Sequence, residues 1–433
     1  MADKKSMDAF KKLSSHNSLN INELIKYARQ YSNFYKELHK NLPDIAPLEI
    51  FPLTPSEKFW ESNKSTKNTL LTGPQDDGIL LRSGGTTGNP KFSVYSKLEW
   101  EICTQLAGEK FGLSHIESKD RVANLFFAGG LYGSYLFATR ILELCPIDVV
   151  HLPIAGHTSN QEMGEILEQF KPNVLMGVPG TIIGLADHLR KNKMDGSYIK
   201  KIFFAGDFFF SDQENLVKSI FKNAAIYPIS YASSDAGLIG YHDKTCGKDE
   251  YRSIDDYIHV EILDEHTLKN IDVPGKEGII VITNLFRKLM PIIRYPAGDR
   301  GMWVENTTGK DRKFKLLGRS DEAARAGGIK FYVSEVRNLL NTYKNKIQFV
   351  DFQMILEHKN LKDHLTIKIA TLSAPKTHEK YEKEIISQLI NSRPKTEILE
   401  AQNICILIEW VLPEHLITSL KTGKIKRVID QRE

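Results

Sequence analysis

The sequence is poor in cysteine, and its cysteines form no metal-binding pattern. Four occur among 433 residues, and no two of them make a C-x-x-C pair or join histidines at zinc-site spacing. A chain of this length buries enough apolar surface to fold without disulfides. We therefore expect reduced cysteines, no zinc site and a cytoplasmic protein.

Long apolar runs are missing as well. The longest uncharged run, residues 122–139, is interrupted by glycine, asparagine and serine. It is therefore too polar for the roughly 20 apolar residues of a membrane span, and we interpret it as a buried strand followed by a loop. Residues 1–12 are charged and lack the apolar stretch of a signal peptide. The sequence thus predicts no membrane partner.

Charge of one sign is not in excess either. The chain has 58 Lys and Arg against 54 Asp and Glu, which gives a net charge of +4. Spread over this length, that charge is too small to indicate a nucleic-acid partner. The hydrophobic share of 41% and the charged share of 26% are those of a globular protein and exclude a collagen-like or coiled-coil architecture.

What the sequence does contain is an alternation of strands and helices from about residue 78. Apolar runs of strand length are followed by stretches with helical periodicity, which predicts an α/β architecture with a parallel sheet. The predicted strands are residues 78–81, 121–127, 147–152, 174–178, 202–205 and 225–229, and the predicted helices are residues 160–170, 180–191 and 211–223.

The pattern changes towards the C-terminus. Residues 260–263 and 278–283 read as strands joined through a turn, and from Gly318 a compact α+β segment follows. We therefore predict an α/β protein with a large N-terminal domain of sheets packed with helices, residues 1–318, whose residues 1–45 form a helical lead-in. A small C-terminal α+β lobe would comprise residues 319–433.

The strongest local motif is the segment 83–91, SGGTTGNPK, directly after an apolar strand. Glycines let the backbone approach an anion, and hydroxyl and N–H groups donate to its oxygens, so the segment predicts a phosphate-binding loop. It is not a Walker loop, because Asn89 and Pro90 stand where Lys and Ser/Thr are required. The alternative is a solvated turn.

Four later motifs are weak when taken singly. They are YASSD at 231–235, RYPAGD at 294–299, GRSDE at 318–322 and KTGKIKR at 421–427. In this order, with the phosphate loop, they resemble the core motifs of the adenylate-forming superfamily of acyl-CoA synthetases, peptide-synthetase adenylation domains and luciferases. The short chain, the GRSDE turn and the compact lobe resemble the phenylacetate–CoA ligase branch, which includes acyl-protein synthetases and enzymes that activate aryl acids for amide formation.

The resemblance implies a set of ATP-binding residues. In the phosphate loop, Thr86, Thr87 and Lys91 would reach the β- and γ-phosphates. Tyr231 would stack on adenine, and Ser234 would lie beside the α-phosphate. The residues implied to contact the nucleotide are Ser83, Gly84, Gly85, Thr86, Thr87, Gly88, Lys91, Gly206, Asp207, Tyr231, Ala232, Ser233, Ser234, Asp299, Arg319 and Lys424.

The same resemblance implies roles in catalysis and domain movement. Asp299 would accept both ribose hydroxyls, with Arg319 as the second ribose contact. Asp235 stands where the family has a Glu that holds Mg²⁺, and it remains a hard carboxylate ligand. Lys424 would reach the α-phosphate and the substrate carboxylate during adenylation, so Lys424, Thr86 and Lys91 are the implied catalytic residues.

Two further residues are implied to act after adenylation. Asp321 matches the hinge about which the mobile C-terminal lobe turns, and Gly328 matches the glycine that approaches the thiol acceptor. A turn at Asp321 would remove Lys424 and bring in Gly328 for thioester formation.

The acid-binding residues are expected beside the nucleotide. We place the pocket between the adenine strand and the glycine-rich segment 129–135, GGLYGSY, with residues 205–210 flanking the nucleotide. Aromatic side chains in these segments would sandwich a flat ring, or else belong to the ordinary core. The candidate residues are Tyr132, Gly133, Tyr135, Ala205 and Phe208.

The resemblance therefore implies a ligase that depends on ATP and Mg²⁺. It would adenylate a small aromatic carboxylic acid, release pyrophosphate and pass the acyl group to coenzyme A. Two alternatives stay open: transfer to a carrier-protein thiol, a protein thiol or an amine, and a non-catalytic nucleotide-binding regulator. The oligomeric state stays open, with a homodimer as one alternative because dimers are common in the family.

Overall fold

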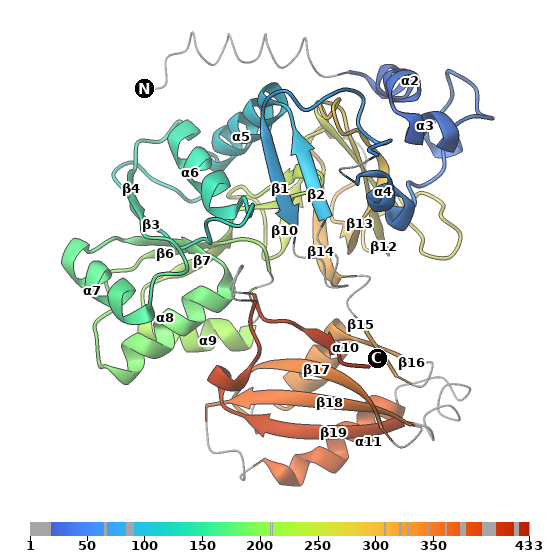
Figure 1. Cartoon of the computed structure of the whole chain (residues 1–433). Coiled ribbons are helices and arrows are strands. Elements are labelled where there is room, and N and C mark those ends of the chain that lie inside the picture. The colour runs from blue at the N-terminus through green and yellow to red at the C-terminus, as the bar shows by residue number, and fades with distance from the viewer. Residues whose placement is uncertain are drawn as a thin grey trace.

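The computed structural model describes residues 19–64, 67–83, 91–207, 209, 211–306, 309–319, 323–326, 329–344, 346–359, 362–372, 378–391, 404–419 and 424–432. These residues form a mixed α/β fold with a large N-terminal part and a smaller C-terminal lobe (Figure 1). Within these ranges no helix is both long enough and apolar enough to cross a bilayer.

A five-stranded parallel sheet lies in the large part, as the alternation of strands and helices predicts. Its spatial order is β4-β3-β5-β6-β7, and every neighbouring pair is parallel. The strands are β3 (Arg121–Asn124), β4 (Val150–Pro153), β5 (Val174–Gly177), β6 (Lys201–Phe204) and β7 (Ala225–Pro228).

Helices cover both faces of this sheet. Alternate side chains of a strand point to opposite faces, so Ile202 of β6 packs in the core on one side and Phe203 in the core on the other. Burial on both faces explains why the strands read as continuous apolar runs. The helices are α5 (Lys97–Phe111), α6 (Ser134–Leu144), α7 (Asn160–Phe170), α8 (Pro179–Lys191) and α9 (Ser211–Ile220).

One expectation is wrong at this sheet. The uncharged run 122–139 does not end as a loop, because α6 begins at Ser134. Three residues of α6 at helical spacing, Ala138, Ile141 and Leu142, are buried against the core. The run therefore contains a strand, a glycine-rich loop and the first turns of a helix. Helix α5 was not anticipated either, because buried residues surround much of its circumference.

A seven-stranded antiparallel sheet forms the rest of the large part. Its order is β11-β12-β13-β14-β10-β9-β8, and the two strands predicted around residues 260 and 280 are the antiparallel pair β11 and β12. The strands are β8 (Ser230–Ser233), β9 (Gly237–Tyr241), β10 (Glu250–Arg252), β11 (Ile258–Leu263), β12 (Glu277–Asn284), β13 (Ile292–Trp303) and β14 (Lys313–Arg319). A separate antiparallel hairpin is formed by β1 (Ile79–Ser83) and β2 (Lys91–Tyr95).

Short helices near the N-terminus are fastened to a distant segment of the chain, residues 285–294. Tyr35 donates its hydroxyl proton to the carbonyl of Pro291 at 2.9 Å, and the backbone N–H of Leu19 donates to Leu285 at 3.0 Å. These contacts join the first described residues to the antiparallel sheet. The helices are α2 (Ile21–Tyr31), α3 (Asn33–Leu38), η1 (Leu48–Ile50) and α4 (Ser56–Ser62).

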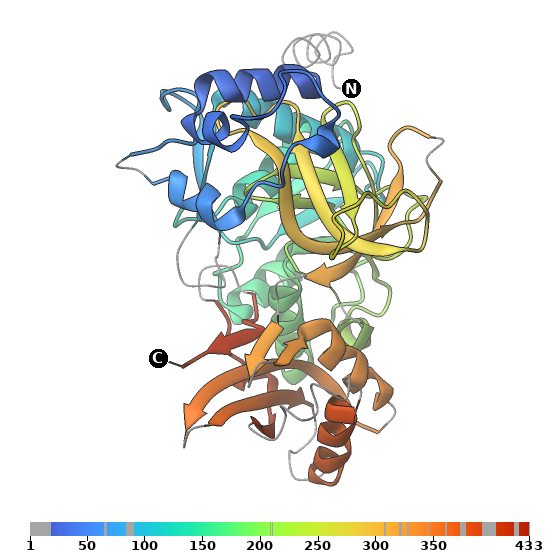
Figure 2. The ribbon, with the colours of Figure 1, turned by 90° about the vertical axis from the view of Figure 1, so that its right-hand side faces the viewer.

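The C-terminal lobe has its own sheet and core. The sheet order is β19-β18-β17-β20, with one antiparallel pair between β17 and β18 and parallel pairs at both edges. Figure 2 shows the lobe below the large part. Its elements are β15 (Ala323–Ala326), β16 (Ile329–Tyr332), α10 (Val333–Thr342), β17 (Phe349–Lys359), β18 (Lys362–Thr371), η3 (Glu379–Tyr381), α11 (Glu382–Asn391), β19 (Ile404–Val411), η5 (Pro413–His415) and β20 (Val428–Asp430).

Candidate active site

Three of the residues implied to bind adenine and ribose lie together. Asp299 of β13 and Arg319 of β14 are register partners, and Arg319 Nε lies 3.7 Å from Asp299 Oδ1. The hydroxyl of Tyr231 donates to Asp299 Oδ2 at 2.6 Å. Burial, and next the negative charge of Asp299, raise the pKa of Tyr231 well above its ordinary value, so this hydroxyl stays a donor. The ring of Tyr231 is largely covered, with Tyr251 and Phe314 as aromatic neighbours.

The remaining residues of the YASSD motif lie at the end of β8 and in the turn to β9. The backbone carbonyl of Ser234 accepts a hydrogen bond from the Tyr95 hydroxyl at 3.0 Å, which fixes the turn. Ala232 and Ser233 are exposed, so they are open to a ligand.

Asp235, the implied metal ligand, is partly buried in a second polar cluster. Its Oδ2 accepts a hydrogen bond from the Tyr295 hydroxyl at 3.0 Å, and its Oδ1 accepts one from Ser93 Oγ at 3.5 Å. Trp60 Nε1 donates in turn to the Tyr295 hydroxyl at 3.2 Å. Burial raises the pKa of Asp235, although the positive charge of Lys91 opposes the rise. The structure thus brings two of the predicted residues, Lys91 and Asp235, to one place.

The donor set around Asp235 suits Mg²⁺ held jointly with phosphates. In the described part of the chain no three His, Cys, Asp or Glu side chains gather into a metal-binding group, and Asp235 is the one carboxylate that the resemblance implies as a ligand. Mg²⁺ commonly keeps several waters and binds one or two carboxylates together with substrate phosphate oxygens. Asp235 therefore fits a metal that arrives with a nucleotide.

Arg287 stabilises the backbone that carries Asp235. Its side chain is fully buried and donates to the backbone carbonyls of Asp235 and Val94, each at 2.8 Å. Its guanidinium group lies 3.5 Å from the ring centroid of Tyr95, and its Nε lies 3.9 Å from a carboxylate oxygen of Glu99. The sequence offered no signal for this role, because Arg287-Lys288 reads as an exposed basic pair.

The C-terminal lobe places Lys424 against the large part. Gly206, in the loop after β6, has a φ of +85°, and a Cβ added there would lie 3.2 Å from Lys424 Nζ and 3.1 Å from its Cε. The glycine thus leaves room for the lysine. Beside it, Asp207 Oδ2 lies 3.5 Å from a guanidinium nitrogen of Arg427. Two segments that are more than 200 residues apart in the sequence therefore meet here.

An apolar cavity of about 270 Å³ adjoins the glycine-rich loop. Two of the predicted acid-binding residues, Tyr132 and Tyr135, line it, while Gly133 backs onto Leu81, whose Cδ2 would be 2.9 Å from an added Cβ. The sequence predicts the adenine strand β8 as the opposite wall, but this cavity is instead closed by β1. Ala205 does not line this cavity. The lining residues are Ile79, Leu80, Leu81, Ala128, Gly129, Leu131, Tyr132, Tyr135 and Leu136.

Comparison with known proteins finds relatives that match most of the chain. No protein-family model matches the chain. A phenylacetate-coenzyme A ligase of Aromatoleum evansii is 24% identical over 399 residues, which cover 90% of this chain and 87% of the relative. The chain is a homologue of the phenylacetate–coenzyme A ligases. An indoleacetate–lysine synthetase of Pseudomonas savastanoi is 26% identical over 54% of this chain and 58% of its own length.

A solved structure has the same fold over nearly the whole chain. It is a 2-hydroxyisobutyryl-CoA ligase in the postadenylation state in complex with an acyl-AMP, with a TM-score of 0.73 and 18% identity over 95% of this chain and 88% of that one. The chain therefore has the fold of this acyl-CoA ligase.

Several predicted site residues lie outside the part of this chain that the structure describes. Of Ser83 only the backbone is described; it ends β1 and pairs with Lys91 at the start of β2, so the hairpin fixes both ends of the predicted phosphate loop. The residues that lie outside are Gly84, Gly85, Thr86, Thr87, Gly88, Phe208, Asp321 and Gly328.

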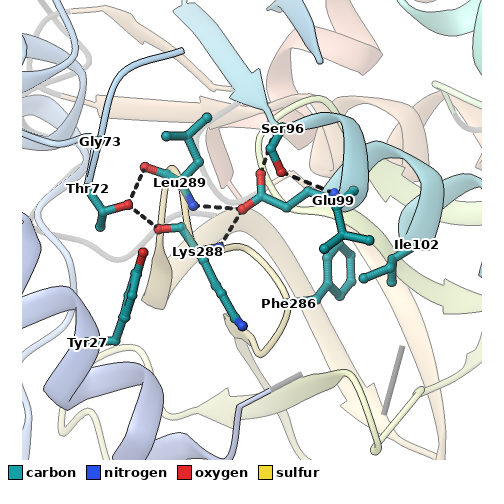
Figure 3. Close-up of a pocket in the computed structure, with 10 residues that line it drawn as sticks. Tyr27, Thr72, Gly73, Ser96, Glu99, Ile102, Phe286, Lys288 and Leu289 are labelled. Atoms are coloured by element: carbon teal, nitrogen blue, oxygen red, sulfur yellow. Dashed lines mark hydrogen bonds between the residues drawn. The ribbon is translucent and has the colours of Figure 1, made fainter. Parts of the chain in front are cut away.

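A second cavity, of about 230 Å³, lies where the N-terminal helices meet α5 (Figure 3). Its lining includes Tyr27, Thr72, Glu99 and Lys288 and none of the predicted site residues. The Glu99 carboxylate accepts hydrogen bonds from the backbone N–H groups of Lys288 and Leu289 at 2.6 and 2.7 Å, and from that of Ser96 at 2.9 Å. These bonds give Glu99 a structural role, and its carboxylate also lies 3.9 Å from Arg287, which supports Asp235.

Proposed function

We propose that this protein activates a carboxylic acid with ATP, forms an acyl-adenylate with release of pyrophosphate, and transfers the acyl group to coenzyme A. The observation that carries the proposal is the contact between Lys424 and Gly206, which brings a cation of the C-terminal lobe to the loop beside the predicted nucleotide residues. The homology to phenylacetate–coenzyme A ligases supports it. So does the fold shared with a ligase solved with its acyl-AMP and CoA.

The proposed chemistry needs positioning and charge rather than a protein nucleophile. The substrate carboxylate attacks the α-phosphorus, and pyrophosphate leaves. Negative charge develops on the phosphoryl oxygens, where the ammonium group of Lys424 would stabilise it. Asp299 and Arg319 would hold the ribose, with Tyr231 fixing the Asp299 carboxylate. Asp235 would hold Mg²⁺, which when bound neutralises phosphate charge.

We propose an aromatic substrate. The cavity beside the glycine-rich loop is lined by aliphatic side chains and two tyrosines, a lining that suits a flat apolar ring. The names of two groups of relatives, phenylacetate ligases and an indoleacetate synthetase, point to the same class of acid.

A second candidate keeps the adenylation and changes the acceptor to an amine. The similarity to an indoleacetate–lysine synthetase favours it, although that similarity covers 54% of the chain. The two candidates separate by asking whether coenzyme A or lysine accelerates AMP release in the presence of the preferred acid.

The experiment that tests adenylation is acid-dependent exchange of labelled pyrophosphate into ATP, measured over a panel of aryl and fatty acids. Lys424→Ala should lower exchange about a hundredfold or more, because it removes a charge aimed at the developing oxyanion. Lys426→Ala is the matched control, since Lys426 is exposed and two residues away. Exchange at the wild-type rate in Lys424→Ala would refute the role of this lysine.

A further inference from the structure

A cluster of buried charges joins the C-terminal lobe to the large part of the molecule. At its centre is Asp351 of β17, which is 1% exposed. Its Oδ1 accepts from the guanidinium groups of Arg337 and Arg427, both in the lobe. Its Oδ2 accepts from the side-chain amide of Gln213 at 2.7 Å, and Gln213 belongs to α9 of the large part.

Charges of opposite sign meet across the domain contact. Burial alone would raise the pKa of Asp351, but the positive charges of Arg427 and Arg337 together bring that pKa below its ordinary value. Within the lobe, two guanidinium groups face one carboxylate. The second carboxylate, Asp207, comes from the large part and lies 3.5 Å from Arg427. The two parts of the molecule therefore contribute opposite charges to one buried contact.

Apolar contact accompanies the charged one. Val350, next to Asp351 in β17, is 3% exposed and packs in the core that α8 and α9 form on the parallel sheet, with Phe209, Leu216 and Val217. At the edge of the contact, Lys191 Nζ of α8 lies 3.9 Å from a carboxylate oxygen of Glu414 in the lobe. This outer pair is exposed and contributes little.

The buried charge cluster is connected to Lys424 through the backbone and through the sheet of the lobe. Arg427 follows Lys424 by three residues, and its carbonyl accepts a hydrogen bond from the N–H of Met354 at 2.8 Å. The next residues form β20, which pairs in parallel with β17. The segment that carries Lys424 is thus bound to the strand that carries Asp351, so fixing Asp351 on the large part also fixes Lys424 relative to Gly206.

We propose that Asp207, Gln213, Asp351 and Arg427 form an interdomain latch that holds the lobe in the arrangement in which Lys424 lies against Gly206. The four are positioning residues, and they act on the reaction through Lys424. The latch itself does not depend on the proposed function; its effect on adenylation does. For Asp207 it provides a contact within the protein, in addition to the nucleotide contact that the family resemblance implied.

The latch is tested first without any substrate, by the reactivity of a buried thiol. Val350→Cys places a thiol of similar size in the domain contact, and its initial rate of alkylation reports how often the lobe leaves α9. The rate is resolved by peptide mass spectrometry, with Cys103, 1% exposed in the large part, as the reference for wider unfolding. In this background Gln213→Leu and Asp207→Asn should each raise labelling of the introduced thiol about tenfold, because each removes a contact to a charged group.

Glu214→Gln is the matched control. It is the next residue of α9, and its charged partners, Lys218 and Lys248, lie in the large part. Glu214→Gln should leave the labelling rate of the introduced thiol within about twofold of its rate in Val350→Cys alone. An unchanged rate in both Gln213→Leu and Asp207→Asn, or a rise matched by an equal rise at Cys103, would overturn the latch.

The second arm measures the two half-reactions. Gln213→Leu should lower acid-dependent pyrophosphate exchange about tenfold and leave thioester formation from supplied acyl-adenylate unchanged, whereas general misfolding would lower both. Equal loss in both half-reactions would refute the positioning role. If no acid of the panel supports pyrophosphate exchange by the wild-type protein, while thiol labelling responds as expected, the proposed function fails and the latch stands.

Discussion

On the large-domain side of the site, the acidic side chains are fixed by hydrogen bonds within the antiparallel sheet and its immediate neighbours. On the lobe side, Lys424 is fixed by contacts that cross between two separately built units. Asp299 is held by Tyr231, and Asp235 by Tyr295 and by Arg287 behind it. Lys424 instead depends on how Asp351 meets Gln213.

The difference shows how one site combines permanent and reversible geometry. Contacts inside the sheet break only when the large part unfolds, so the groups proposed to bind the nucleotide keep their positions. If the lobe turns as the family resemblance implies, contacts between the two units break without unfolding either core, and the proposed catalytic cation would be delivered and withdrawn. Three substitutions test this comparison.

Arg287→Met should have the largest effect, and the effect should be on stability. It removes a fully buried cation that donates to two backbone carbonyls and lies near Glu99. We expect the free energy of unfolding in denaturant to fall by about 3–5 kcal/mol. Arg140→Met, which removes an exposed i,i+3 pair with Glu143, is the control and should cost less than about 1 kcal/mol. Equal losses would mean that the buried network does not hold the sheet side.

Gly206→Ala should have an intermediate effect on catalysis. At a φ of +85° an alanine is strained by about 1–2 kcal/mol, and its Cβ would displace the end of Lys424. Pyrophosphate exchange should fall about tenfold, because small displacements of a catalytic group are costly. Gly275→Ala shares the strain, with a φ of +79°, but its Cβ would meet nothing within 4 Å. It should lose similar stability and keep its exchange rate; a loss of exchange there would assign the effect to strain alone.

Tyr295→Phe should have the smallest effect, on metal dependence. Burial and Asp235 raise the pKa of Tyr295 well above its ordinary value, so its hydroxyl stays protonated and donates to that carboxylate. Losing this bond should raise the Mg²⁺ concentration for half-maximal exchange about fivefold. Tyr35→Phe removes a buried hydroxyl that bonds to backbone, and it should lower stability without altering the Mg²⁺ dependence. An unchanged Mg²⁺ requirement in Tyr295→Phe would argue against Asp235 as the ligand.

Periodicity in the sequence predicted the elements that neighbouring residues determine, namely the strands and helices of the parallel sheet. Strand–helix alternation predicted the parallel sheet. The family resemblance implied roles for Gly206 and Lys424, and the fold brings these two residues together. The sequence did not predict the roles of Arg287, Gln213 and Asp351. These roles arise from partners 50 to 200 residues away in the sequence. The glycines before α6 concealed a helix whose buried stripe is short.

The fastening of the N-terminal helices to residues 285–294 also has a consequence for how the protein is made. Tyr35 and Pro291 are 256 residues apart, so at about 5–20 residues per second the ribosome delivers the partner roughly 13 to 50 seconds after Tyr35 itself. During that interval the apolar side chains of α2, such as Leu24 and Ile25, lack the residues of the antiparallel sheet that belong to the same hydrophobic cluster. The nascent chain must therefore keep its earliest helices soluble until the last third of the large part emerges.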